Sequence, residues 1–117
     1  MTDLVAMLST GKGTWAEVAN LIKAQEWENV YLIANTFGAQ NFSADRAVNF
    51  VIIDNNADTD SIQKAILEQL KGKIRSEIAL SMYSGSGKEH MALISAALQF
   101  GVGIRLVVMK NKEMIEL

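Results

Sequence analysis

The stretch I-A-L-S-M-Y-S-G-S-G-K-E-H-M, residues 78–91, joins an apolar run to a helical segment through two glycines, two serines and a lysine. An ordinary strand-to-helix connection needs one capping residue and at most a single glycine. Ser86 and Glu89 form an S-x-x-E pattern, which predicts a helix that begins at about Gly87. The further glycine predicts a backbone that another group can approach closely.

Five short apolar runs recur along the chain, each followed by a polar or amphipathic stretch. They span residues 4–8, 30–34, 48–54, 78–83 and 104–109. The first three are nearly continuous in apolar residues, which is typical of strands that helices cover on both faces. We therefore expect five mainly parallel strands, since strand–helix alternation implies right-handed crossovers. A K-N-K-E turn at 110–113 then permits a short final strand, M-I-E-L, that folds back antiparallel.

Three helices are expected between these strands, at about residues 14–27, 61–74 and 87–100. Thr14 and Glu17 form a second capping-box pattern, so Thr14 is expected to act only as a cap. Residues 35–43, after the second run, are expected to form a looser connection. Residues 1–117 are thus predicted to be a single Rossmann-like α/β domain, with a mainly parallel sheet of five strands flanked by helices and a short antiparallel C-terminal strand.

The composition excludes several classes of site. The 117 residues include no cysteine and one histidine, His90. Disulfides, thiol catalysis and clustered thiolate or imidazole metal sites are excluded, and neither a metal nor a cofactor is predicted. The net charge of −2, with both signs mixed along the chain, argues against an extended nucleic-acid surface or a membrane-binding face but allows a local basic pocket. The first residues lack a basic segment and a long apolar run, so we expect a cytoplasmic protein without a membrane span.

The topology indicates where a ligand would bind. Ligands of open parallel sheets lie beyond the carboxyl ends of the strands, where the strand order reverses. If the first and fourth strands are neighbours, the loops at 9–14 and 83–89 lie side by side there. Both loops combine glycine, hydroxyl groups and a lysine, and both open a helix, whose N-terminal N–H groups and dipole favour anions. The predicted ligand-binding residues of these loops are Ser9, Thr10, Gly11, Lys12, Gly13, Ser84, Gly85, Ser86, Gly87 and Lys88.

The lysines and serines each allow a plainer interpretation. Lys88 lies in the first turn of its helix, where its charge opposes the dipole. A bound phosphate would reverse that sign, whereas a solvated side chain would need no ligand, and Lys12 is open to the same two interpretations. Ser86 is expected to cap the helix and can also contact a ligand. Ser84 and Tyr83 have no capping duty and are therefore the better candidates for ligand contact.

Side chains after the second strand form a further group of candidates. Asn35 and Thr36 are expected to contact a base or a ribose. Phe37 and Phe42 either stack on a base or anchor the core. His90 has no acid partner nearby in the sequence, so packing or an interface is a more natural role for it than base catalysis.

Two phosphate-binding motifs fit the sequence poorly. G-K-G-T-W-A at 11–16 matches the dinucleotide fingerprint, but the second strand ends at Asn35 rather than at the acid that would hold a ribose. G-S-G-K-E at 85–89 departs from the Walker pattern, because Glu89 replaces the required Ser or Thr. A dinucleotide-dependent enzyme is therefore disfavoured.

A resemblance to a known family is carried by residues 78–108, I-A-L-S-M-Y-S-G-S-G-K-E-H-M-A-L-I-S-A-A-L-Q-F-G-V-G-I-R-L-V-V. This run resembles the fourth strand, signature loop, helix and fifth strand of CRISPR-associated Rossmann-fold (CARF) domains. M-L-S-T-G-K-G-T-W, residues 7–15, is similar to the first strand and the Ser/Thr-Gly loop of that family. The resemblance implies a homodimer that binds a cyclic oligoadenylate, a second messenger of antiviral defence, across its two-fold axis. Most family members carry a fused effector domain, and none is expected within these 117 residues.

Some members of the family cleave the ring without a metal. By the resemblance, Ser9 and Thr10 would orient the phosphodiester and Lys88 would stabilise the charge that develops on it, so these three are the candidate catalytic residues if the protein cleaves its ligand. The alternative is a non-catalytic regulatory or assembly module that binds another nucleotide or none. The sequence contains no aligned acid–base pair that would decide whether the protein is an enzyme.

The helix at 88–100 favours a homodimer independently of the resemblance. Apolar side chains occur around most of its circumference: Met91, Leu93, Ile94, Ala97, Leu98 and Phe100. A sheet can cover only one face of such a helix. Either a two-fold partner covers the remainder, or the helix at 15–27 does so within one subunit.

Overall fold

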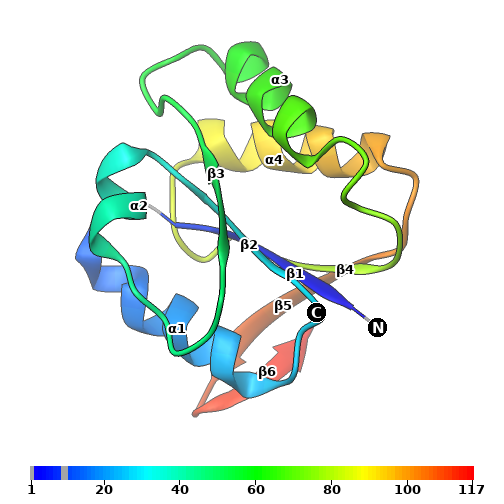
Figure 1. Cartoon of the computed structure of the whole chain (residues 1–117). Helices are drawn as coiled ribbons and strands as arrows, with labels where there is room; N and C mark the ends of the chain where they lie inside the picture. Colours follow the sequence, from blue (N-terminus) through cyan, green and yellow to red (C-terminus); the bar gives the residue numbers. More distant parts are fainter. Residues whose placement is uncertain (1, 9–10) are drawn as a thin grey trace.

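The computed structural model of the chain describes residues 2–8 and 11–117. Its centre is a six-stranded sheet with the strand order β3-β2-β1-β4-β5-β6 (Figure 1). The strands are β1 (Asp3–Met7), β2 (Val30–Ala34), β3 (Asn49–Ile52), β4 (Ile78–Ser81), β5 (Ile104–Lys110) and β6 (Glu113–Glu116). β1 to β5 run parallel, and β6 is antiparallel to β5. The expected mostly parallel α/β sheet with an antiparallel C-terminal pair is confirmed, and with β6 included the described sheet has six strands.

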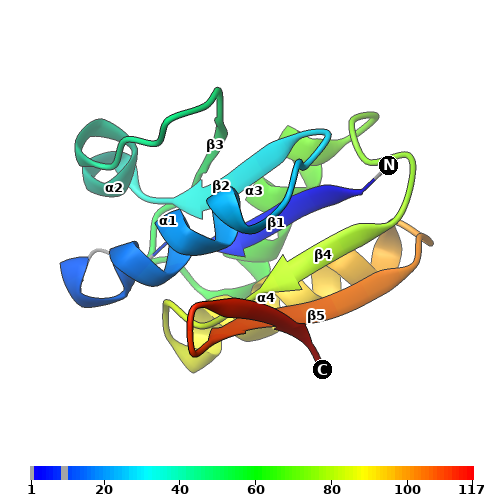
Figure 2. The ribbon, with the colours of Figure 1, turned by 90° about the horizontal axis from the view of Figure 1, so that it is seen from below.

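Helices cover both faces of this sheet. They are α1 (Trp15–Ala24), α2 (Thr36–Asn41), α3 (Thr59–Leu70) and α4 (Gly87–Gln99), and a short 3-10 turn, η1 (Lys12–Thr14), precedes α1. α3 and α4 pack against each other on one face, and α1 lies on the other (Figure 2). The sheet therefore has a separate hydrophobic core on each side.

The continuous apolar run of β1 follows from this two-sided packing. Leu4 and Ala6 contribute to the core beneath α1, whereas Val5 and Met7 contribute to the core beneath α3 and α4. Every residue of β1 is buried, because β2 and β4 flank the strand and helices cover both of its faces. β1 and β4 are hydrogen-bonded neighbours, so their carboxyl ends, and the loops that follow them, start side by side.

The helix α2 was not expected from the sequence. It begins directly after β2, in the segment predicted to be a looser connection. The Oδ1 of Asn35 accepts a hydrogen bond from the Gly38 N–H at 2.9 Å, which is the usual N-cap arrangement. At the other end, the buried ring of Phe42 packs edge-on against Trp15, with ring centroids 5.7 Å apart. The cap and the aromatic contact together hold a helix that is too short to show a hydrophobic period.

Arg105 ties the C-terminal strand to the amino ends of the central strands. Its guanidinium donates hydrogen bonds to Glu77 at 2.5 Å, to Thr2 at 3.2 Å and to Glu116 at 3.1 Å. Thr2 also donates to Glu77 at 2.9 Å. The hydrogen bonds from Arg105 and Thr2 hold the pKa of Glu77 below its ordinary value.

Candidate functional site

The two loops that the sequence analysis singled out meet at the carboxyl edge of the sheet. The Oγ1 of Thr14, at the end of η1, donates a hydrogen bond to the Oγ of Ser84 at 2.7 Å. Thr14 belongs to the connection that follows β1, and Ser84 belongs to the connection that follows β4. The expectation that these loops lie side by side is therefore confirmed for the described residues. Ser9 and Thr10, two of the candidates, lie outside the described residues.

The role expected for Thr14 is wrong. Its backbone is already helical, with φ −103° and ψ 0°, and its side chain makes no capping hydrogen bond. The 3-10 turn η1 precedes α1 directly, so Thr14 lies within continuous helical backbone rather than at the extended position that an N-cap needs. Its hydroxyl bonds to the neighbouring loop instead.

Ser84 is more constrained than the sequence suggested. Ser84 is only 1 % exposed, and its hydroxyl accepts the hydrogen bond from Thr14. Tyr83, the preceding residue, is 56 % exposed and is the more accessible of the two. Direct contact of Ser84 with a ligand stays a prediction, and its observed role is to join the two loops.

The predicted cap of α4 is confirmed. The Ser86 Oγ accepts a hydrogen bond from the Glu89 N–H at 3.4 Å, and the Glu89 Oε1 accepts one from the Ser86 N–H at 2.8 Å. This reciprocal capping box explains why Glu89 is buried. The N–H groups of Gly87 and Lys88, in the first turn, have no intrahelical acceptor. Groups of this kind can donate hydrogen bonds to a bound anion.

Gly85 lets the loop pass close to the end of β1. Its φ is +105°, and a Cβ at this position would lie 2.7 Å from the Met7 Cγ and 3.3 Å from the Glu89 Oε1. The Nε2 of His90 lies 2.8 Å from the Ser84 carbonyl oxygen. Because a carbonyl only accepts, the imidazole proton is on Nε2 and His90 donates this bond. This bond gives His90 a structural role, since it holds the loop from within α4.

Lys88 shares the lining of a hollow with two aspartates that the sequence analysis did not connect with it. It lines a hollow of about 490 Å³ between the beginnings of α3 and α4, together with Asp58, Thr59, Asp60, Gln63 and Ser95. Among the described residues, no ion pair links Lys88 to either aspartate. The assignment of Lys88 as a phosphate contact stays a prediction.

Asn35 and Thr36 line a separate hollow at the carboxyl ends of β2 and β3. It has a volume of about 380 Å³, and its other lining residues are Phe37, Ile52, Ile53, Asp54 and Asn55. The Asn35 Nδ2 donates to the Asn55 Oδ1 across this hollow at 3.4 Å. Sequence reasoning missed Asn55 and Asp54, because only the pairing of β2 with β3 brings the β3–α3 connection next to α2.

The two phenylalanines of this region have different surroundings. Phe42 is 8 % exposed and anchors the core, whereas Phe37 is 45 % exposed. The Phe37 ring lies 6.2 Å from the Trp15 ring, centroid to centroid, at an angle of 45°. Phe37, together with Ile52, presents an apolar surface beside the amides of the hollow. Such a mixture of ring face, amide and carboxylate groups suits a nucleoside.

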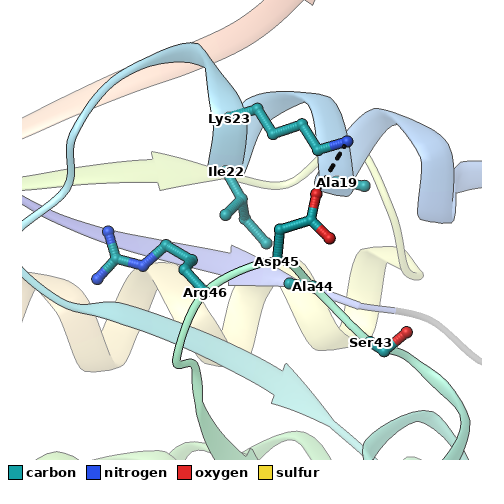
Figure 3. A pocket seen from close by; sticks show the side chains of 7 residues that line it. All are labelled: Ala19, Ile22, Lys23, Ser43, Ala44, Asp45 and Arg46. Carbon is teal, nitrogen blue, oxygen red and sulfur yellow. Dashed lines mark ion pairs between the residues drawn. The ribbon is translucent and has the colours of Figure 1, made fainter.

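A third hollow, of about 270 Å³, is lined by none of the candidate residues (Figure 3). Its lining comes from α1 and from residues 43–46, and the Lys23 Nζ lies 3.5 Å from the Asp45 Oδ2 across it. Arg46 donates to the Trp27 carbonyl at 2.7 Å. These charged groups serve the local structure, and no signal in the sequence indicated this hollow.

Among residues 2–8 and 11–117, no three histidine, cysteine, aspartate or glutamate residues are arranged to hold a metal ion. In the same part of the chain no helix has the length and apolar character needed to cross a bilayer. No protein-family model matches the chain, and no curated protein matches it.

Proposed function

We propose that the protein is a Rossmann-like, CARF-like domain that binds a cyclic oligoadenylate across a homodimer at the carboxyl edge of its sheet. The observation that carries this proposal is the Thr14–Ser84 hydrogen bond, which joins the two glycine-containing loops at that edge. The strand order 3-2-1-4-5-6 supports it, because doubly wound sheets of this order bind nucleotides where the order reverses, next to β1 and β4.

The phosphates of the ligand would lie over the loops that follow β1 and β4. The first turn of α4 offers the N–H groups of Gly87 and Lys88 together with the positive end of the helix dipole. The Lys88 ammonium group would bind the phosphate as well. The residues of the first loop proposed to contact the ligand are Ser9, Thr10, Gly11, Lys12 and Gly13.

The hollow beside α2 would take a base or a ribose. It lies at the ends of β2 and β3, which are the next strands after β1 in the sheet. Asn35, Thr36 and Asn55 supply donors and acceptors there, and the exposed ring of Phe37 supplies a stacking surface. This arrangement supports the prediction that Asn35 and Thr36 contact the nucleoside part of the ligand.

The outer face of α4 supports the homodimer. Met91 is 62 % exposed, Ile94 38 % and Leu98 67 %, and these residues follow one another at helical spacing. The alternative that α1 covers this face is wrong, because α1 packs on the opposite side of the sheet. Residues 91–104 contain no charged side chain, so two copies of α4 can meet without repulsion. Such a two-fold contact would also pair two copies of the 84–88 loop.

Ligand binding without turnover is the second candidate. The hydroxyl of Ser84 and the cap of Ser86 and Glu89 are engaged in structural bonds. These observations favour a regulatory or assembly module. Ring cleavage would instead require Ser9 and Thr10 to orient the phosphodiester and Lys88 to stabilise its developing charge.

Calorimetric titration with cyclic tetra-adenylate and cyclic hexa-adenylate, followed by chromatography of the recovered ligand, tests both candidates. Saturable binding of one ring per dimer supports the proposal. Linear product in the recovered ligand would add ring cleavage, and intact ligand would identify a binding module. Absence of binding to either ring would overturn the cyclic oligoadenylate assignment.

A further inference from the structure

The free edge of β3 has the composition of a self-pairing strand. β3 is the terminal strand on one side of the sheet, and it lies in the run V-N-F-V-I-I, residues 48–53, which contains no charged residue and no proline. Ile52 is 39 % exposed. An uncharged, β-prone segment at a sheet edge is a ready template for another strand.

Gln69 of α3 occupies part of that edge. The N–H of Ile53 donates to the Ala34 carbonyl of β2 at 2.9 Å, so the N–H and C=O of the preceding residue, Ile52, point away from the sheet. The Ile52 N–H donates to the Gln69 Oε1 at 2.9 Å, and the Gln69 Nε2 donates to the Ile52 carbonyl at 2.7 Å. A carboxamide has the same donor and acceptor as a peptide group, so the side chain takes the place of a neighbouring strand.

The position of this carboxamide is fixed by its own helix. The Nε2 of Gln69 carries two hydrogens, and it also donates to the Ala65 carbonyl, one helical turn earlier, at 3.2 Å. The side chain therefore bridges α3 and the backbone of β3 with both of its amide hydrogens in use. This is more than a packing contact, because an apolar side chain of the same size would leave the Ile52 N–H and C=O without these partners.

From these contacts we infer that the β3 edge is a surface for antiparallel pairing with β3 of a second copy of the chain, and that Gln69 keeps it closed. The second copy is the matching partner because the run at 48–53 is uncharged and meets no like charge when it pairs with itself. The edge at β6 differs: Glu113 and Glu116 would oppose the same residues of another copy, which disfavours pairing there. Charge protects the β6 edge, and Gln69 protects the β3 edge.

This inference does not depend on the proposed function. The α4 surface and the loops after β1 and β4 take no part in it. Ile52 also lines the hollow beside α2, but the test measures molar mass without a ligand. The molar mass of each variant is compared with that of the unmodified protein under the same conditions, so the result is clear whether that protein is a monomer or a dimer.

The test measures molar mass by light scattering on a sizing column, over a range of protein concentrations. Gln69→Ala is expected to double the mass or to give larger assemblies as concentration rises. Gln63→Ala, on the same helix but without a bond to β3, is the matched control and should leave the mass unchanged. Adding Ile52→Lys to Gln69→Ala places a charge on the edge and should restore the original mass.

A Gln69→Ala protein that is folded by circular dichroism and keeps the original mass at every concentration would overturn the inference. Hydrogen exchange on the unmodified protein tests it without any variant. Phe50 and Ile52 both direct their N–H groups to the free edge, and only Ile52 is bonded to Gln69. The Ile52 amide should exchange more slowly than the Phe50 amide, and equal rates would contradict the closed edge.

Discussion

Thr14 and Ser84 are 70 residues apart in the chain, yet the Oγ1 of Thr14 donates a hydrogen bond to the Oγ of Ser84 at 2.7 Å. The bond joins the connection after β1 to the connection after β4, at the point where the order of the strands reverses. It is possible because η1 places Thr14 in helical backbone and leaves its hydroxyl directed at the other loop rather than at its own helix.

We expect this bond to couple the two loops energetically. Thr14→Val and Ser84→Ala should each lower the free energy of unfolding by about 1 kcal/mol, the usual net contribution of a hydrogen bond. The double variant should lose little more than either single variant, because the same bond is removed in each case. Urea unfolding of the four proteins measures the coupling. Strictly additive losses would show that the two hydroxyls act independently.

Gly85 is expected to tolerate no side chain. Gly85→Ala combines a φ of +105° with a Cβ placed 2.7 Å from the Met7 Cγ, and strain with overpacking should lower the free energy of unfolding by about 2–4 kcal/mol. Gly87→Ala is the matched control, since a Cβ there meets nothing within 4 Å and the backbone is helical. A thermal or urea unfolding series compares the two. Equal stability of the two variants would contradict the close approach of the loop to β1.

Lys88 should matter to ligand affinity more than to stability. If it bonds a phosphate, Lys88→Ala should weaken binding of cyclic tetra-adenylate by about 1–3 kcal/mol, the range for a hydrogen bond to a charged group. The control is Lys112→Ala, in the turn between β5 and β6. Calorimetric titration measures both variants. Unchanged affinity for Lys88→Ala would contradict a phosphate contact of this lysine.

Glu77 should make folding more sensitive to acid. Hydrogen bonds from Arg105, and then from Thr2, lower the pKa of Glu77 in the folded protein relative to its ordinary value of 4.5. The unfolded chain therefore binds this proton more readily, so the stabilisation is complete above the ordinary pKa and is lost as the pH falls through the folded pKa. Glu77→Gln should be less stable than the unmodified protein at neutral pH, and the difference should shrink in acid. Urea unfolding from neutral to acidic pH measures this difference in the free energy of unfolding, with Glu113→Gln as a control. A difference that is independent of pH would contradict this account.

The sequence was informative where local patterns decide the structure. Val30–Ala34 lies within strand β2 as predicted, because a strand buried on both faces needs a continuous apolar run. The helix start at Ser86 and Glu89 was also predicted correctly, since a capping box is a short-range interaction. The Thr14 and Glu17 pattern also located the start of α1 correctly, but the Thr14 side chain makes no capping bond, because a preceding 3-10 turn changes the backbone conformation.

The parts of the candidate site that could not be predicted depend on tertiary contacts. The hollow that Lys88 lines together with Asp58 and Asp60 follows from the packing of α3 against α4. The hollow that brings Asn55 to Asn35 follows from the pairing of β3 with β2. Neither hollow leaves a local pattern in the sequence. Sequence motifs therefore indicated Asn35 and Lys88 but not the residues that line the same hollows.

The most direct test of the central claim is to follow the glycine amide signals by NMR during titration with cyclic tetra-adenylate. Glycines occur both beyond the carboxyl ends of the strands and near their amino ends, so their amide signals report separately on ligand binding at each end of the sheet. The account predicts that signals at the carboxyl edge shift in proportion to bound ligand: Gly11, Gly13, Gly85 and Gly87. Signals near the amino ends of β4 and β5 should stay unchanged: Gly72, Gly101 and Gly103. Shifts confined to the second group, or no shifts at a saturating concentration of ligand, would contradict a nucleotide site at the loops joined by Thr14 and Ser84.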